Sequence, residues 1–283
     1  MTQGMTAMDD SLPPARWCAV TGASRGIGRA VAQGLLASGF SVIGIARNAA
    51  LLAELERDWP HRFIALPHDV ARPGLHAAFD QLAERGRLRL HDIELAVHCA
   101  GCAFQGAPLT AMSDAELHAT IDTNVLGTTF VVRDLAQLLL QRGSGTLVVL
   151  GSIAGHDAAP LMAAYAASKA YTQQLLRCVR ADLHGSGVRV SCVQPGTTRT
   201  GLLDGQPGLD AAARFEGFAP LEAHDLARTI EWIHQQPAHV NVQEISLFPV
   251  AQSLYVRGIH RHPAQAGHPL LPAQAGHPPL PAR

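Results

Sequence analysis

Short apolar runs alternate with longer amphipathic stretches over most of the chain, and this alternation restricts the folds open to it. The runs typical of strands are Trp17–Thr21, Ser41–Ala46, Phe63–Leu66, Ile93–His98, Thr146–Leu150, Val188–Val193 and Val242–Phe248. The stretches typical of helices lie near Ile27–Ser38, Ala49–Asp58, Ser113–Gln141, Leu161–Leu183 and Ala223–Gln235. Several of the strand-like runs are almost continuously apolar, as in strands buried on both faces of a parallel sheet. This order predicts an α/β fold with a doubly wound parallel sheet, in a single domain over residues 15–257.

The composition predicts a sizeable buried core and excludes two classes of protein. Hydrophobic residues make up 47% of the chain, which excludes a chain that is disordered throughout. Charged residues make up 16%, below the roughly 25% typical of soluble domains. The 22 Lys and Arg residues are balanced by 23 Asp and Glu residues, for a formal net charge of −1. That balance lacks the basic excess expected of a nucleic-acid-binding surface.

No segment has the pattern of a membrane span or an export signal, and the cysteine pattern is not the one expected of a disulfide framework. The first 16 residues contain neither a basic start nor an apolar run. Two charge-free stretches, Leu95–Ser113 and His262–Ala282, are broken by proline, histidine and other polar residues. The five cysteines are odd in number and widely spread. We therefore expect a cytoplasmic protein with reduced thiols.

The two ends of the chain differ from its body. Residues 1–14 show no periodicity and predict a flexible N-terminus. Residues 258–283 contain a nine-residue repeat, Pro263–Leu271 followed by Pro272–Leu280, whose proline content is incompatible with helix or central strand. We expect this tail to be disordered and dispensable for activity. Its histidines match no zinc-binding pattern, so no metal site is expected.

A glycine-rich segment follows the first predicted strand and opens the first predicted helix. The segment is Thr21-Gly22-Ala23-Ser24-Arg25-Gly26-Ile27-Gly28. Glycines at such a junction let the backbone approach a pyrophosphate, whose charge lies at the helix N-terminus. An ordinary glycine-rich turn is the alternative. The flanking strand and helix favour a dinucleotide site.

A second motif, Tyr165-Ala166-Ala167-Ser168-Lys169, places a phenol and an ammonium one helical turn apart. A free phenol exchanges its proton poorly at neutral pH, and a nearby ammonium favours the phenolate. Such a pair can serve as the acid/base of carbonyl reduction or alcohol oxidation. Ser152 follows a predicted strand 13 residues before Tyr165 and can bind the same substrate oxygen. Taken alone, the Tyr–Lys pair would be only a half-exposed helix face.

With both motifs in place, residues from about Arg16 to Phe248 resemble the single-domain, Rossmann-fold branch of the short-chain dehydrogenase/reductase family. The glycine spacing Gly-x3-Gly-x-Gly is the form that this family uses. The resemblance implies that Ser152, Tyr165, Lys169 and Asn124 are the catalytic residues. It further implies that Asn124 supports a water that relays protons to Lys169, and that Lys169 also holds the nicotinamide ribose.

The resemblance also implies a set of cofactor contacts. Asp69 and Val70 would hold the adenine, Ala100 and Gly101 would line its ribose, and Thr198 and Thr200 would hold the carboxamide. The other implied contacts are Gly22, Ser24, Arg25, Gly26, Ile27, Gly28, Arg47, Asn124, Tyr165, Lys169, Pro195 and Gly196.

The chain departs from the family pattern after the fourth predicted strand. His98-Cys99-Ala100-Gly101 stands where the family usually has Asn-Asn-Ala-Gly. The second Asn normally braces the central strands, which Cys99 cannot do, so we expect lower stability or cofactor affinity. Cys99 and Cys102 also have the spacing of a redox pair. Because they lie at a strand end and not at a helix N-terminus, buried thiols are the favoured interpretation.

The residues near the second strand favour NADP over NAD. Rossmann folds that bind NAD carry an acidic residue about 20 positions after the glycine motif. That count from Gly26 reaches Ala46, which Arg47 follows directly, and Arg25 lies inside the glycine motif. A guanidinium pairs well with a 2′-phosphate. The alternative is that both arginines are ordinary surface residues.

Together these features predict an NADP-dependent oxidoreductase that moves a hydride between the cofactor and a carbonyl or secondary alcohol. The stretches 237–242 and 248–253 are similar to those of short-chain enzymes that act on small 3-hydroxy acids and serine. The segment 200–220 is expected to form a partly apolar lid. A non-catalytic NADP-binding regulator of the same fold is the alternative. The family resemblance further implies a homodimer or homotetramer that pairs the helices near 113–141 and 161–183.

Overall fold

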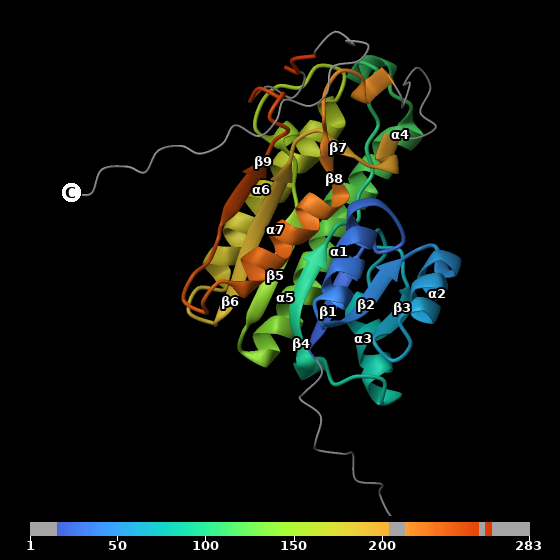
Figure 1. Cartoon of the computed structure of the whole chain (residues 1–283), viewed down its shortest axis with the longest axis vertical. Coiled ribbons are helices and arrows are strands. Elements are labelled where there is room, and N and C mark those ends of the chain that lie inside the picture. The colour runs from blue at the N-terminus through green and yellow to red at the C-terminus, as the bar shows by residue number, and fades with distance from the viewer. Residues whose placement is uncertain (1–15, 204–212, 255–257, 262–283) are drawn as a thin grey trace, which may run out of the picture.

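The seven predicted strands form one parallel sheet in the order β3-β2-β1-β4-β5-β6-β9 (Figure 1). The computed structural model describes residues 16–203, 213–254 and 258–261. The strands of this sheet are β1 Trp17–Thr21, β2 Ser41–Ala46, β3 Phe63–Pro67, β4 Ile93–His98, β5 Gly145–Leu150, β6 Val188–Pro195 and β9 Glu244–Leu247. Every neighbouring pair in this sheet is parallel. The predicted doubly wound Rossmann-type sheet is confirmed.

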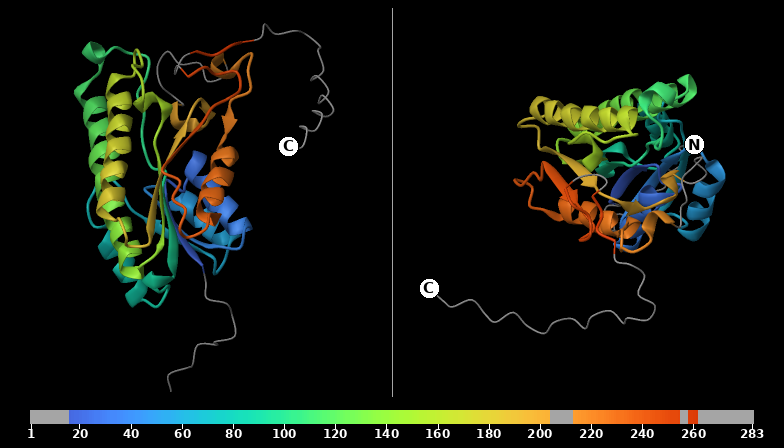
Figure 2. Two further views of the ribbon diagram at one scale, coloured as in Figure 1. Left: turned by 90° about the vertical axis from the view of Figure 1, so that its left-hand side faces the viewer. Right: turned by 90° about the horizontal axis from the view of Figure 1, so that it is seen from above.

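Helices cover both faces of the sheet, as Figure 2 shows. They are α1 Gly26–Ala37, α2 Ala49–Asp58, α3 Leu75–Glu84, α4 Asp114–Ile121, α5 Thr128–Arg142, α6 Ala163–Asp182 and α7 Ala223–Gln235. One hydrophobic cluster joins the sheet to α3, α5 and α6, and a second joins it to α1, α2 and α7. The central strands are therefore buried on both faces, which explains their nearly continuous apolar sequences.

Local capping explains where two of these helices begin. The Ser113 hydroxyl accepts a hydrogen bond from the Glu116 amide, and the Glu116 carboxylate accepts one from the Ser113 amide. This is the capping box that the sequence predicts ahead of α4. The Asn48 side chain likewise accepts a bond from the amide of Leu51 at the start of α2.

Two helical features differ from the sequence prediction. The helix α3 was not predicted, although Leu75, Phe79 and Leu82 are spaced to bury one of its faces. The single helix expected over Ser113–Gln141 is divided into α4 and α5 by a π-helical stretch, Asp122–Gly127. A π-helical turn widens the helix locally, and such turns are frequent at functional sites.

The ends of the chain lie mostly outside the described residues. The predicted flexible segment 1–14 and residues 262–283 of the predicted tail are among them. Residues 258–261, which the sequence assigns to the tail, are described and form part of the body. Ile259 pairs with Gln252 in an antiparallel bridge, and the His260 amide donates to the Ala251 carbonyl at 2.8 Å.

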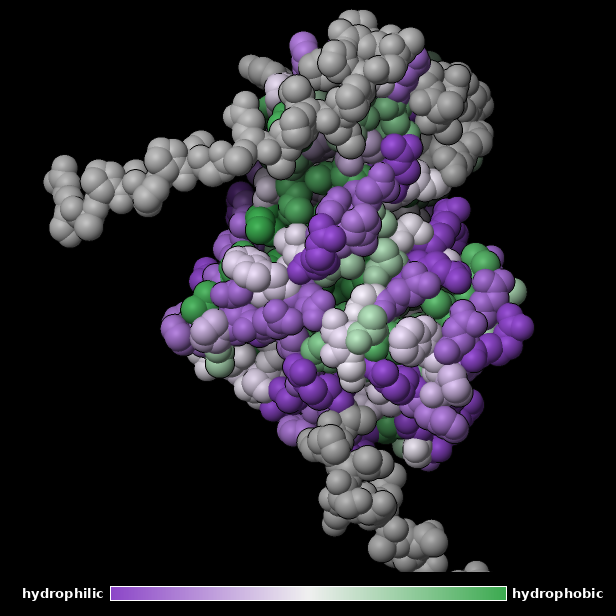
Figure 3. Space-filling view, in the orientation of Figure 1, coloured by the Kyte–Doolittle hydropathy of each residue, from purple (hydrophilic) through white to green (hydrophobic). Residues whose placement is uncertain are grey.

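The carboxyl ends of the strands lie toward the upper end of the molecule in Figure 1, where a second, two-stranded sheet pairs β7 Thr198–Arg199 with β8 Leu221–Glu222. Figure 3 shows hydrophobic side chains in the upper part of this face and mostly hydrophilic side chains below. Among the described residues, no helix is long and apolar enough to span a membrane.

Candidate active site

Two adjoining cavities open at the carboxyl ends of the strands, where β1 and β4 lie side by side and the strand order reverses. In doubly wound sheets this switch point is where ligands bind. The first cavity has a volume of about 740 Å³ and the second about 440 Å³. Residues that line both include Ile27, Cys99, Gly101 and Thr200. The cavities therefore form one continuous site.

The first cavity collects most of the predicted cofactor contacts. They are Gly22, Ser24, Arg25, Gly26, Ile27, Gly28, Arg47, Asp69, Val70, Ala100, Gly101 and Thr200. The second cavity is lined by Gly101, Ser152, Tyr165, Lys169, Pro195, Gly196, Thr198 and Thr200. Asn124 lines neither cavity, but its Oδ1 atom would lie 3.3 Å from a Cβ atom on Gly101, which lines both. Sequence positions that are far apart thus line the same two cavities.

The glycine-rich loop leaves no room for side chains at two positions. Gly22 has φ +71°, and a Cβ atom there would lie 2.9 Å from the amide nitrogen of Ala100. A Cβ atom on Gly28 would lie 2.3 Å from the carbonyl oxygen of Gly22. The loop is thus packed against the end of β4, and the N-terminus of α1 is directed at the cavity. This cradle fits a pyrophosphate group.

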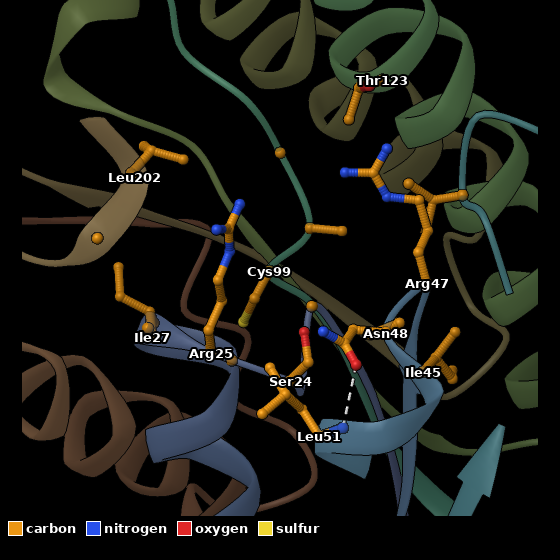
Figure 4. A pocket seen from close by; sticks show the side chains of 18 of the residues that line it. Ser24, Arg25, Ile27, Ile45, Arg47, Asn48, Leu51, Cys99, Thr123 and Leu202 are labelled. Carbon is orange, nitrogen blue, oxygen red and sulfur yellow. Dashed lines mark hydrogen bonds between the residues drawn. The ribbon is translucent and has the colours of Figure 1, made fainter. Parts of the chain in front are cut away.

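Arg25 and Arg47 reach into the first cavity from the loops that follow β1 and β2 (Figure 4). Both side chains are exposed. Within the described residues, neither guanidinium makes a hydrogen bond or ion pair with the protein. Ala46, which precedes Arg47 and also lines the cavity, provides no carboxylate. The two arginines therefore offer positive charge to an anionic ligand.

The remaining side of the first cavity is formed by Asp69 and Val70, after β3. The Asp69 carboxylate accepts a hydrogen bond from the amide of Ala71 at 3.1 Å, which fixes the turn. A Cβ atom on Gly127 would lie 3.0 Å from the Val70 carbonyl oxygen, so this turn packs directly on the π-helical stretch.

Ser152, Tyr165 and Lys169 line one cavity and are all buried. Tyr165 and Lys169 lie one turn apart on α6, and the Lys169 Nζ atom lies 5.8 Å from the centre of the phenol ring. Nζ also donates a hydrogen bond to the Leu150 carbonyl at 2.9 Å. The Ser152 hydroxyl follows β5 and accepts a hydrogen bond from the amide of Ala154.

The π-helical stretch places Asn124 beside this group. Its Oδ1 atom accepts a hydrogen bond from the Cys102 amide at 2.9 Å, and its Nδ2 atom donates to the Cys102 carbonyl at 2.8 Å. Nδ2 also donates to the hydroxyl oxygen of Ser168, on α6, at 3.1 Å. Asn124 thus joins the loop after β4 to the helix that carries Tyr165 and Lys169.

His98 braces the central strands. Its Nδ1 atom lies 2.7 Å from the Thr21 hydroxyl, and its Nε2 atom lies 3.0 Å from the Thr128 hydroxyl. The Thr21 oxygen also accepts from the amides of Cys99 and Ala100. Because that oxygen already accepts two bonds, its proton is directed at Nδ1, and the neutral ring donates from Nε2. Burial lowers the pKa of His98 to about 3.

The cysteines at the end of β4 are not activated. Burial raises the pKa of the Cys99 thiol to about 12, and it also raises the pKa of Cys102. A redox pair needs the opposite shift, toward the thiolate. The Cys102 thiol donates to the Ala119 carbonyl. Both thiols are partly buried and line the second cavity, so they are less enclosed than the sequence predicts, but neither is activated.

Two glutamines that the sequence did not single out support the site. The buried Gln252 accepts a hydrogen bond from the Thr197 amide at 2.8 Å, and its Oε1 atom occupies the space where Gly196 lacks a side chain. The buried Gln173 donates to the Ser152 carbonyl at 3.0 Å. Gln173 belongs to no motif with its own chemistry, and Gln252 lies in the stretch 248–253, which the sequence marks only by its similarity to enzymes of small 3-hydroxy acids.

Comparison with known proteins agrees with this geometry. The family model described as short chain dehydrogenase matches residues 16–207. The chain belongs to this family. Its short-chain dehydrogenase relatives include serine 3-dehydrogenase of Rhizobium radiobacter, 32% identical over 83% of this chain and 94% of that protein. Sulfoacetaldehyde reductase 2 of Chromohalobacter salexigens is 34% identical over the same shares of the two chains.

A solved structure of another short-chain dehydrogenase has the same fold. The closed form of a serine dehydrogenase complexed with NADP+ superposes with a TM-score of 0.78 at 28% identity. The match covers 87% of this chain and 99% of that one. The predicted family and fold are therefore confirmed.

Proposed function

We propose that this short-chain dehydrogenase moves a hydride between NADP(H) and a carbonyl or secondary alcohol, with Tyr165 as its acid/base. The observation that carries the proposal is the convergence of Ser152, Tyr165 and Lys169 on one cavity, which continues into the glycine-lined cavity. The relatives named above are dehydrogenases or reductases, and this disfavours the alternative of a non-catalytic regulator.

The residues of the first cavity fit a dinucleotide. The cradle at Gly22 and Gly28 suits the pyrophosphate, and Asp69 with Val70 suits the adenine. Thr198 and Thr200 line the cavity that holds Tyr165, where they suit the carboxamide. When bound, the cofactor supplies the hydride chemistry, and the protein supplies orientation and electrostatics.

The protein's own part of the reaction is to hold the substrate oxygen and to move a proton. Ser152 binds that oxygen and stabilises the charge that develops on it. Tyr165 donates the proton in reduction and accepts it in oxidation. Lys169, whose Nζ atom lies 5.8 Å from the centre of the Tyr165 ring, binds the cofactor ribose, and Asn124 holds the water through which the proton continues.

We propose a strong preference for NADP over NAD. Arg25 and Arg47 line the first cavity without protein partners in the described part of the chain, which suits a 2′-phosphate. Ala46 occupies the position of the usual ribose-binding acid, so no carboxylate repels the phosphate there. The serine dehydrogenase structure that resembles this one contains NADP+.

Small hydroxy acids are the substrate class that the relatives suggest. Besides serine 3-dehydrogenase, they include an NADP-dependent 3-hydroxy acid dehydrogenase of Salmonella typhi, 28% identical over 86% of this chain. The substrate cavity of about 440 Å³ is of the size that small molecules occupy.

We further propose a homodimer or homotetramer that works in the cytoplasm. Leu126 precedes α5, Leu140 lies on it and Tyr171 lies on α6, and their exposed fractions are 44%, 48% and 37%. Exposed apolar side chains on neighbouring helices favour a contact with a second copy. All five cysteines are unpaired thiols, which suits a reducing compartment.

A substrate panel tests the proposed activity. The purified protein is incubated with NADPH and a series of aldehydes and ketones, and with NADP+ and a series of 3-hydroxy acids, while cofactor absorbance is followed. Turnover that depends on the carbonyl or alcohol supports the proposal. Cofactor binding without turnover of any member would instead restore the non-catalytic alternative.

A further inference from the structure

Charge is distributed unevenly around the substrate cavity. Its lining includes the apolar residues Leu150, Ile153 and Met162. The charged residues that line it are Lys169, Arg214 and Arg261, all of them basic. Among its described lining residues there is no aspartate or glutamate. Basic side chains at a partly enclosed cavity raise the local concentration of anions.

Arg261 belongs to a segment that is folded onto the body and not to a loose tail. Ile259 lines the same cavity and pairs with Gln252, whose side chain supports the turn at Gly196 and Thr197. The Ser253 amide donates to the Gly258 carbonyl at 2.6 Å. The segment 258–261 therefore lies at the cavity, next to the turn at Gly196 and Thr197.

The Arg261 side chain is held in place by contacts on several sides. Its guanidinium donates to the carbonyl oxygen of Arg214 at 2.9 Å and to that of Glu216. It also lies over the ring of Phe218, with Cζ 5.2 Å from the ring centre. A guanidinium fixed in this way is preorganised, so binding an anion orders fewer side-chain rotations.

Arg214 lies beside it and is braced by the neighbouring aromatic ring. Its guanidinium carbon lies 5.4 Å from the centre of the Phe215 ring, which in turn lies 6.4 Å from that of Phe218. The two phenylalanines of the predicted lid thus stack against the two arginines, and neither ring lines the cavity itself. A planar guanidinium binds carboxylate and sulfonate groups with parallel hydrogen bonds.

We infer that Arg214 and Arg261 bind an anionic head group, a carboxylate or a sulfonate, carried by the substrate at a distance from its reacting carbon. The inference rests on the proposed function, because it assigns the substrate class of the same site. It also makes the segment 258–261 part of the specificity machinery.

The test compares three aldehydes as substrates with NADPH: succinic semialdehyde, its methyl ester, and the sulfonate of the same chain length. The readout is the ratio of kcat/KM for each anion to that for the ester. We expect a ratio of at least about ten, which corresponds to roughly 1.4 kcal/mol. A higher ratio for one anion identifies whether the head group is a carboxylate or a sulfonate.

Variants then assign the effect to the two arginines. In Arg261→Gln and in Arg214→Gln the anion-to-ester ratio should fall about tenfold, mostly through KM for the anion, and Arg261→Lys should restore part of it. The matched control is Arg228→Gln, since Arg228 is 69% exposed, pairs with Asp225 and does not line the cavity. It should keep the original ratio.

A binding measurement separates failure of the inference from failure of the proposed function. Calorimetric titration with butanoate, which has no carbonyl to reduce, should show weaker binding by Arg261→Gln than by the unmodified protein. An anion-to-ester ratio of about one in the unmodified protein would overturn the inference. So would a ratio and a butanoate affinity that stay unchanged in both Gln variants. In either case, turnover of the ester would still uphold the proposed function. Butanoate binding that depends on the arginines, without turnover of any aldehyde, would uphold the anion site and contradict the proposed function.

Discussion

The Nδ1 atom of His98 lies 2.7 Å from the hydroxyl oxygen of Thr21, and this contact joins the two central strands at the edge of the cofactor cavity. The sequence shows only that the asparagines usual at this place are missing. In the structure the imidazole reaches both Thr21 and Thr128, so it makes the brace that Cys99 cannot. The expected loss of bracing is therefore compensated by the residue next to it.

His98 should make the free energy of unfolding depend on pH in the acidic range. Its pKa is about 3 in the folded protein, lowered from the ordinary 6.5 by burial. Between these values the unfolded chain binds a proton that the folded chain does not, so stability falls as pH falls. From pH 6 to pH 4 the loss from this residue should be about 2 kcal/mol. In His98→Asn, the free energy of unfolding, measured with urea, should fall less steeply between pH 6 and pH 4. The exposed control His239→Asn should match the unmodified protein. The same pH dependence of the unfolding free energy in all three proteins would contradict the role given to His98.

Gly22→Ala should weaken cofactor binding more than it weakens the fold. The new Cβ atom would meet the Ala100 amide at 2.9 Å, so the loop must move from its cradle. We expect the Kd for NADPH, measured by fluorescence titration, to rise at least about tenfold. Gly143→Ala is the matched control, because Gly143 has nearly the same φ, +76°, and nothing within 4 Å of an added Cβ. Its unfolding free energy should fall through backbone strain, with NADPH affinity unchanged. Equal losses of affinity in the two variants would mean that the close approach to Ala100 is unimportant.

Cofactor choice should depend on Ala46 and Arg47. The unmodified enzyme should prefer NADPH over NADH by at least about tenfold in kcat/KM, which requires roughly 1.4 kcal/mol. The double variant Ala46→Asp, Arg47→Leu should reverse that preference, because a carboxylate binds the ribose hydroxyl and repels the phosphate. Steady-state kinetics with both cofactors measures it. Equal use of both by the unmodified enzyme would refute the preference.

Assembly should depend on the face formed by α5 and α6. Leu140→Glu places a charge where a side chain of 48% exposure is proposed to meet a second copy. Light scattering should show a smaller assembly for this variant. Trp232→Glu on α7 is the control, since Trp232 has the same exposure on the opposite side of the sheet. A monomeric unmodified protein, or dissociation by Trp232→Glu alone, would argue against this interface.

Much of the fold was predictable because its signals are local. Continuous apolar runs identified the strands of the main sheet, and strand-helix alternation gave its topology. The helix α3 was missed because its apolar positions lie in a short, His- and Asp-containing segment without a side-chain cap. The π-helical stretch was missed because the contacts of its side chains are long-range: Asn124 bonds to Cys102, 22 positions away.

The residues of the site were predictable where they belong to a motif with known spacing. They were unpredictable where a distant segment of the chain returns to the cavity. The residues Ser152, Tyr165 and Lys169 carry fixed spacing, so their convergence could be expected. Ile259 and Arg261 belong to a segment whose proline-rich continuation predicts a dispensable tail. Their place at the substrate cavity results from a bridge to Gln252, which leaves no periodic pattern in the sequence.

The role of Tyr165 is the centre of this account, and kinetics of Tyr165→Phe test it most directly. The substitution keeps the buried ring and removes the exchangeable proton. With the best substrate from the panel, kcat should fall by a factor of about 100 to 10,000, while the Kd for NADPH stays within about threefold. Turnover within about threefold of the unmodified enzyme, at unchanged NADPH affinity, would show that another group moves the proton.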